Sequence, residues 1–147
     1  MKVSNKQITR PYDQCHMNLD FTQINPELDE LLPKCLHEFC STAAREKGEV
    51  LFATGEKPAQ MYFVGEGEVV LERLGAQGSS VVLQRTLHGF VGEASLESAR
   101  YHCDGKVVAS SQITKIPIQE LREAMDHDSE FSSRWISMLN REVKRLR

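Results

Sequence analysis

The segment 89–96 (GFVGEASL) carries the clearest chemical signal in the sequence. Gly92 allows a ligand to approach the backbone closely, because glycine has no β-carbon. A short helix that begins near Glu93 would direct unpaired N–H groups at an anion. We therefore take Gly92, Glu93, Ala94 and Ser95 as candidate residues of an anion-binding loop.

Other residues that often do chemistry are scattered along the chain. No two histidines stand at the His-x-His spacing that a cupin-type metal enzyme would use. The sequence has no Ser/His/Asp arrangement, no P-loop and no Gly-x-Gly-x-x-Gly motif, and Gly65-Glu66-Gly67 lacks the third glycine. We predict that the chain is not an enzyme. The histidines are His16, His37, His88, His102 and His127.

The four cysteines contain no Cys-x-x-Cys pair, and we expect them to be reduced thiols. Two cofactor alternatives stay open. The cysteines imitate the number of ligands in an iron–sulfur sensor, and Tyr101-His102-Cys103 offers a haem ligand or a redox-active thiol. The prediction for this chain is that it holds no metal and no cofactor. The cysteines are Cys15, Cys35, Cys40 and Cys103.

Composition and charge are those of an ordinary globular protein. The 147 residues are 40% hydrophobic and 27% charged, and their net charge of −3 argues against nucleic-acid binding by the chain as a whole. The segment 134–147 is locally basic, with five basic residues and one acidic residue. No stretch is apolar enough for a membrane span or a signal peptide, so we expect a cytoplasmic protein without membrane contact.

The hydrophobic periodicity predicts a helix, then a set of strands. Asn25-Pro26 is a helix start, and Pro33 should divide the helix that follows. After Gly48 the period changes from about 3.6 to 2, which is typical of strands. Several short strands with turns between them predict an antiparallel roll of the double-stranded β-helix (jelly-roll) type, not alternating β and α units. The strands are predicted at 50–52, 61–64, 68–74, 80–87, 106–110 and 113–117, with a turn or bulge at 65–67.

Helical patterning returns at 118–126, and a longer helix is predicted from about residue 128. Its apolar residues are spaced by three, four and three positions, as along the seam of a coiled coil. We predict a homodimer formed through this helix. The alternative is that the same stripe packs back on the roll. The seam residues are Ile136, Leu139, Val143 and Leu146, with Trp135 beside them as a core or interface anchor.

This order of elements resembles the sensor domain of the CRP/FNR family of regulators, which has a cyclic-nucleotide-binding-like fold. The resemblance covers residues 28–147. It is carried by the segments GEVLF (48–52), MYFV (61–64), GEV (67–69) and GFVGEASL (89–96) in that order. It implies a β-roll sensor domain at 25–127 and a dimerisation helix at 128–147. Residues 1–24 show no sustained periodicity, and we predict that they form an arm.

The resemblance also implies which residues should bind the ligand, and here the sequence departs from the family. In the family an Arg neutralises the cyclic phosphate and a neighbouring Ser donates to it. In an ungapped alignment from Gly92 these positions fall on Cys103 and Asp104. A neutral thiol and a like charge should cost several kcal/mol of phosphate binding. A shifted loop would bring in Arg100 or Lys106 instead. We predict a degenerate pocket that does not bind cyclic AMP in the usual way.

The resemblance implies transcription regulation, in which an unknown small-molecule effector alters the pairing of the terminal helix. DNA would be bound only through a helix-turn-helix domain, which is not present in these residues. Two alternatives keep the same fold. One is a redox sensor that uses iron–sulfur, haem or thiol chemistry, and the other is a regulatory module of a protein that does not bind DNA.

Overall fold

The computed structural model describes residues 25–145, apart from the side chains of Ala94, Ser95 and Arg145. The predicted arm at 1–24 and the seam residue Leu146 lie outside the described residues. The chain divides into two compact units. One is Cys40–Ile118, and the other combines Phe39 and the residues before it with Gln119 and the residues after it. The domain boundaries drawn from the sequence stay a prediction.

The helical unit begins where the sequence predicted, and proline divides its first helix. Asn25 caps α3 (Pro26–Leu31), and its side-chain oxygen accepts a hydrogen bond from the N–H of Glu27 at 2.8 Å. Pro33 then separates α3 from α4 (Lys34–His37). Cys35 of α4 is exposed, whereas the buried apolar residues of this region are Leu28, Leu32 and Leu36.

Two further helices follow the roll, as predicted. They are α5 (Ile118–His127) and α6 (Ser129–Arg145), which are separated at Asp128. The Asp128 carboxylate accepts from the N–H of Phe131 at 3.0 Å and so caps α6. On α6 the rings of Phe131 and Trp135 pack edge to face with centroids 6.0 Å apart.

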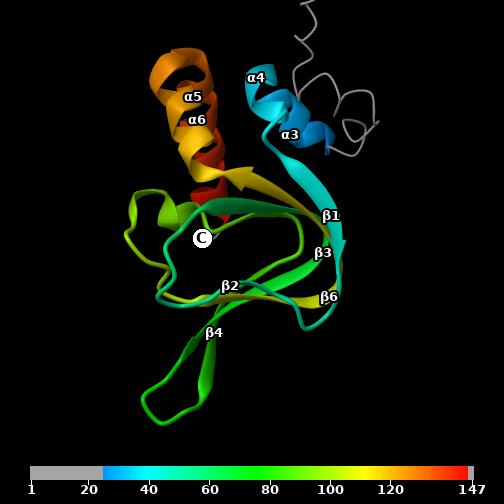
Figure 1. Cartoon of the computed structure of the whole chain (residues 1–147), viewed down its shortest axis with the longest axis vertical. Coiled ribbons are helices and arrows are strands. Elements are labelled where there is room, and N and C mark those ends of the chain that lie inside the picture. Colours follow the sequence, from blue (N-terminus) through cyan, green and yellow to red (C-terminus); the bar gives the residue numbers. More distant parts are fainter. Residues whose placement is uncertain (1–24, 146–147) are drawn as a thin grey trace, which may run out of the picture. The chain divides into compact units, whose positions relative to one another are not determined.

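The second unit is the predicted antiparallel roll (Figure 1). Two long strands, β3 (Gln60–Leu74) and β6 (Asp104–Pro117), pair along most of their length. In the sheet order β1-β6-β3-β4, the outer strands are β1 (Ser41–Arg45) and β4 (Ser80–Thr86). Short strands β2 (Val50–Phe52) and β5 (Gly89–Val91) pair with β6 and β3 respectively.

Four details of the strand prediction are wrong, and one of them is that β5 (Gly89–Val91) was not predicted as a strand. Strand β1 was not predicted, because Ser41–Arg45 (STAAR) has no apolar alternation and is held by its register with β6. The segments 61–64 and 68–74 are one strand, β3, and 106–110 and 113–117 are one strand, β6. The predicted irregularity at 65–67 is confirmed, since the β3–β6 register shifts on both sides of Glu66.

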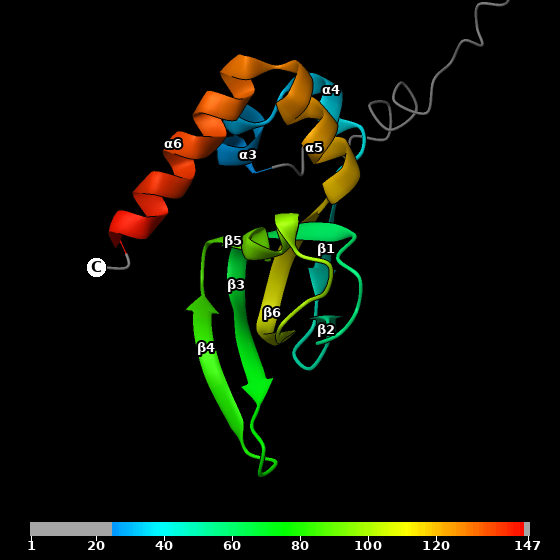
Figure 2. The same cartoon turned by 90° about the vertical axis from the view of Figure 1, so that its left-hand side faces the viewer.

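The core of the roll holds aromatic and branched residues of five segments, which are β2, β3, β5, β6 and the loop before β6. Figure 2 shows β3 and β4 running on as a hairpin away from the rest of the roll. Val81, Val82 and Leu83 of this hairpin are about half exposed, so it adds little to the core. The buried core residues are Phe52, Tyr62, Val64, Val69, Val91, Tyr101, Val107 and Ile113.

Candidate functional site

The candidate anion loop lies at the end of β5, and a short helix begins at Glu93 as the sequence predicted. Gly92 follows β5 directly with φ +92°, a left-handed backbone that favours glycine. The next element is a five-residue 3-10 helix, η2 (Glu93–Glu97), in which Glu93 is partly buried. The side chains of Ala94 and Ser95, two of the predicted site residues, lie outside the described residues.

Aromatic rings fill the interior of the roll beside this loop. The Phe52 ring stacks on Tyr101 with centroids 4.1 Å apart and lies 5.9 Å from the Tyr62 ring. A β-carbon added to Gly105 would lie 2.6 Å from Cε2 of Phe52, and one added to Gly92 would lie 3.9 Å from the same atom. Phe52 therefore occupies the space between the candidate loop and the start of β6.

The ungapped alignment predicts that Cys103 stands at the family's arginine position and Asp104 at its serine position. Cys103 packs against this aromatic core. It is partly buried, and burial raises the pKa of its thiol above the usual value of 9.0. Arg73 is close enough to oppose that shift, and its Nε donates to the carbonyl of His102 at 3.2 Å. At neutral pH, Cys103 is thus a neutral thiol, which offers no charge to an anion.

Asp104, at the family's serine position, is held by the turn between β2 and β3. One carboxylate oxygen accepts from the backbone N–H of Thr54 at 2.7 Å and from the Thr54 hydroxyl at 2.9 Å. These hydrogen bonds lower the pKa of Asp104 below its usual 3.8. The residue is an ionised acceptor at neutral pH and has no proton to donate to a phosphate.

The two residues considered as replacement cations have partners elsewhere. Nη1 of Arg100 donates to the carbonyl of Gly55 at 3.1 Å, on an exposed loop. Nζ of Lys106 lies 2.5 Å from Oε2 of Glu72. The Lys106–Glu72 hydrogen bond raises the pKa of the lysine and lowers that of the glutamate. The structure brings neither cation to Cys103.

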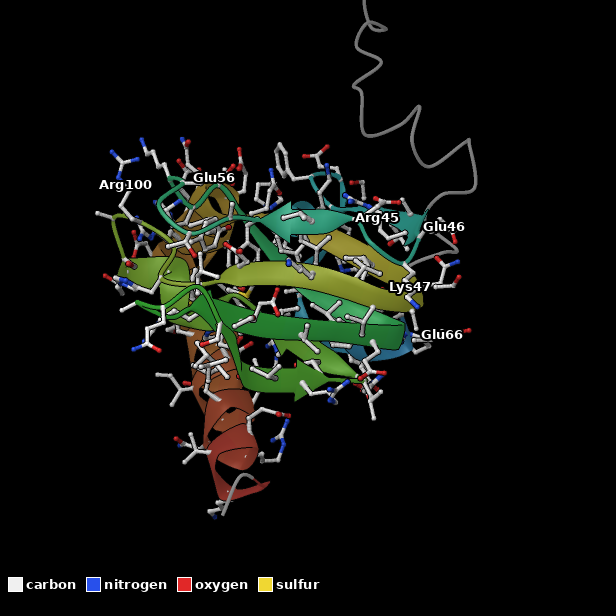
Figure 3. All side chains as sticks on the ribbon, turned by 90° about the horizontal axis from the view of Figure 1, so that it is seen from below. Arg45, Glu46, Lys47, Glu56, Glu66 and Arg100 are labelled. Carbon is white, nitrogen blue, oxygen red and sulfur yellow. The ribbon has the colours of Figure 1, made fainter. Side chains whose placement is uncertain are left out.

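Figure 3 shows Arg100 and Glu56 at one end of the roll and Arg45, Glu46, Lys47 and Glu66 at the other. The candidate site belongs to the first of these ends. Among the described residues, no group of three or more His, Cys, Asp or Glu side chains is arranged to hold a metal ion. No described helix is long and apolar enough to cross a membrane.

Comparison with known proteins now identifies the fold. A family model described as the cyclic nucleotide-binding domain matches residues 44–128, which is more than half of the chain. The chain belongs to the cyclic nucleotide-binding domain family. This membership agrees with the resemblance found in the sequence. The domains of this family are regulatory domains, not enzymes.

Several solved structures share the fold. The sensor domain of the transcriptional regulator DNR from Pseudomonas aeruginosa is 17% identical with a TM-score of 0.68, covering 90% of this chain and 93% of that one. The catabolite activator protein of Thermus thermophilus is 18% identical with a TM-score of 0.63, covering 93% and 60%. A candidate cAMP-binding regulatory protein from Silicibacter pomeroyi DSS-3 is 26% identical with a TM-score of 0.66, covering 81% and 59%.

The chain therefore spans about three-fifths of the last two proteins. It is also similar to an uncharacterised protein of Haemophilus influenzae (strain ATCC 51907 / DSM 11121 / KW20 / Rd). That protein is 28% identical over 119 residues, which are 79% of this chain and 90% of the relative. The predicted fold class, a β-roll of the cyclic-nucleotide-binding type with flanking helices, is confirmed.

The three described seam residues, Ile136, Leu139 and Val143, all lie on α6 and are at least partly exposed. Ile136 and Val143 are 57% and 50% exposed, and Leu139 is partly exposed. Trp135, in contrast, is only 2% exposed and packs against Phe131 inside the protomer. An apolar stripe is thus left open on α6, next to a separate buried one.

Sequence reasoning missed the residues that decide the local geometry of the site. Thr54 holds Asp104, and Phe52 fills the space beside Gly92 and Gly105. Each pair joins residues about 40 or 50 positions apart in the chain. No local pattern in a single sequence points to such a pair.

Proposed function

We propose that this chain is the sensor and dimerisation part of a CRP/FNR-type transcription regulator whose pocket does not bind cyclic AMP in the usual way. The observation that carries the proposal is the state of the two phosphate-binding positions. Cys103 is a neutral thiol packed on the core, and Asp104 is a carboxylate bound to Thr54. A neutral thiol thus stands in place of the arginine cation, and a carboxylate anion stands in place of the neutral serine donor.

Electrostatics sets the size of the expected effect. A charge-assisted bidentate arginine–phosphate contact is among the strongest hydrogen-bonded pairs in proteins. Its loss, with a like charge added, should weaken binding by several kcal/mol, or more than about a hundredfold. Arg100 and Lys106 do not restore the charge, because each is already paired with a neighbouring group.

Titration calorimetry with cyclic AMP tests this half of the proposal. We expect no measurable heat, or binding no tighter than about millimolar, given that penalty. Submicromolar binding would mean that the ligand meets a cation after all. Arg100→Ala and Lys106→Ala would then show which residue supplies it.

The exposed stripe on α6 supports dimerisation. Ile136, Leu139 and Val143 keep a coiled-coil spacing, and two of them are at least half exposed in the protomer. A contiguous exposed apolar stripe of this kind often marks a surface that binds another protein. A second copy offers the same stripe, so a twofold pair is self-complementary.

Sedimentation of the whole chain tests the pairing. The wild type should sediment as a dimer at micromolar concentration, and the double variant Leu139→Glu/Val143→Glu as a folded monomer. Ser137→Glu/Arg141→Glu is the control, since both side chains are exposed on α6 at heptad positions outside the stripe. A monomeric wild type, or equal effects of the two double variants, would contradict pairing through these residues.

A second candidate function is a regulatory module with no DNA-binding domain attached. The Haemophilus influenzae relative favours it, because the matched region makes up 90% of that protein. The intact mass of the native protein, isolated from its own cells with an antibody to the roll, separates the two. A mass near 16.7 kDa supports the short module, and a clearly larger mass supports the regulator.

A further inference from the structure

Two loops that are about 50 residues apart in the sequence are joined beside the candidate site. They are the turn 53–56, between β2 and β3, and the segment 98–104, which leads from η2 into β6. The N–H of Gly55 donates to the carbonyl of Tyr101 at 2.9 Å, and the N–H of Tyr101 donates to the carbonyl of Glu56 at 2.9 Å. The guanidinium of Arg100 adds a bond to the carbonyl of Gly55 at 3.1 Å.

Asp104 completes this junction from the other side. Its Oδ1 accepts both donors of Thr54, the backbone N–H and the hydroxyl, at 2.7 and 2.9 Å. It supplies the only ionised acceptor among the five hydrogen bonds described here between the two segments. Hydrogen bonds to a charged acceptor are roughly twice as strong as those between neutral groups.

The Asp104 carboxylate stands at a position that the alignment assigns to ligand binding. In the ungapped alignment with the family, Asp104 stands where a neutral hydroxyl donates to the ligand's phosphate. Here the same position carries an anion of the chain itself, and that anion is bound by donors of the chain itself. An anion from outside is therefore not needed to draw the two segments together.

The neighbouring charges leave this arrangement intact. Lys106 is the nearest basic residue on β6, and it pairs with Glu72 of β3. Glu72 is also bonded by the hydroxyl of Ser80 at 2.9 Å. Arg73 donates to the carbonyl of His102, inside the same segment. Of these groups, Arg73 holds the 98–104 segment to β3, and the Asp104 oxygen keeps both donors of Thr54.

We propose that Asp104 is an internal latch that closes the segment 98–104 on the turn 53–56 without any ligand. The loop that would respond to a ligand in a sensor is then held in a single arrangement by the chain's own carboxylate. The inference goes beyond the proposed function, since it depends neither on DNA binding nor on pairing through α6.

Amide hydrogen exchange of the whole chain, followed residue by residue, tests the latch. The reporters are the amides of Thr54, Gly55 and Tyr101, which donate the bonds of the junction. Asp104→Ala should speed their exchange by about tenfold or more, the ratio expected for loss of one charge-assisted hydrogen bond. The amides of β3 at Tyr62 and Phe63 should keep their wild-type rates.

Two further variants keep the test decisive. Thr54→Val removes one of the two donors and should speed exchange at Gly55 and Tyr101 severalfold, even if Asp104→Ala fails to fold. Glu66→Ala, which removes an exposed carboxylate at the other end of the roll, is the matched control and should change nothing (Figure 3). Wild-type exchange rates in both latch variants would overturn the proposal.

Addition of cyclic AMP to the wild type supplies an independent arm. At several millimolar nucleotide, the exchange of Gly55 and Tyr101 should stay unchanged, because the junction is already closed and because the proposed function leaves little nucleotide bound. The informative result in this arm is therefore a change in these amides. If the nucleotide slows these amides by about tenfold, the loop is open without ligand, and the latch is refuted.

Discussion

A methyl group added at Gly105 should disrupt the roll at the point where its aromatic core meets the candidate site. The new β-carbon would lie 2.6 Å and 2.7 Å from Cε2 and Cζ of Phe52. Real contacts of this kind are about 3.5–4.0 Å, so one of the two groups must move by about 1 Å. The Phe52 ring cannot retreat freely, because its other face stacks on Tyr101 at 4.1 Å.

The loss in unfolding free energy caused by Gly105→Ala can be estimated from the known effects of overpacking a protein core. Inserting one carbon where neighbours cannot yield costs about 1–3 kcal/mol, and we expect Gly105→Ala to fall in the upper half of that range. Phe52→Leu alone should cost about 1–2 kcal/mol, through lost packing and a small cavity. The double variant should be less destabilised than the sum of the two by about 1 kcal/mol or more, because leucine vacates the space that the methyl needs.

Urea unfolding of the four proteins in this cycle, followed by far-ultraviolet circular dichroism, measures the coupling. Gln112→Ala is the control for a change on β6, since Gln112 is exposed on the same strand. Strict additivity of Gly105→Ala and Phe52→Leu would refute the reasoning, because it would mean that the ring and the new methyl do not meet.

Three more predictions concern the glycines with positive φ, the described thiols and the Asp104 carboxylate. Gly67→Ala should destabilise the roll by about 2 kcal/mol or more, because φ is +118° and the new β-carbon would lie 2.5 Å from Cα of Ser111. The control is Gly48→Ala, where φ is +100° but the space is open, and it should cost only about 1 kcal/mol in the same urea assay. In timed alkylation at pH 7.5, the exposed Cys35 should react first. Among the described thiols Cys40 should react slowest, because burial raises the pKa of Cys40 to about 12. Equal rates for Cys35 and Cys103 would favour a redox thiol at Cys103. Because the pKa of Asp104 is lowered in the folded protein, its hydrogen bonds to Thr54 should be fully present above about pH 4 to 5 and should be lost as the pH falls through the lowered pKa. The NMR resonance of the Thr54 amide should therefore shift only below about pH 4. A shift of this resonance near pH 6 would contradict the assignment.

Local chemistry in the sequence was enough to predict the main features of the fold. Asn25-Pro26 predicts a capped helix start and Pro33 a break, because proline fixes φ and has no N–H to donate. The glycines at 65 and 67 predict an irregular strand, and Gly67 has a backbone that favours glycine. The order of these signals along the chain, with GFVGEASL at 89–96, was enough to identify the family.

Strand β1 and the lengths of β3 and β6 could not be predicted in the same way. Ser41–Arg45 is a strand because β6 offers it a hydrogen-bonding edge, not because of its own pattern. Strands β3 and β6 continue through their irregular stretches because each holds the other in register. Strand propensity depends on such neighbours more than on the residues themselves.

The sequence by itself determined the family and the position of the candidate loop, and it predicts the loss of a cation at Cys103. Residue identity suffices for these, since charge and backbone freedom belong to each residue alone. Only the tertiary structure decided which groups Asp104, Arg100 and Lys106 bind, and that Phe52 fills the space beside Gly92 and Gly105. The reason is that each partner comes from a distant strand or turn, and hydrogen bonds and ring contacts form only at distances that the closed roll sets.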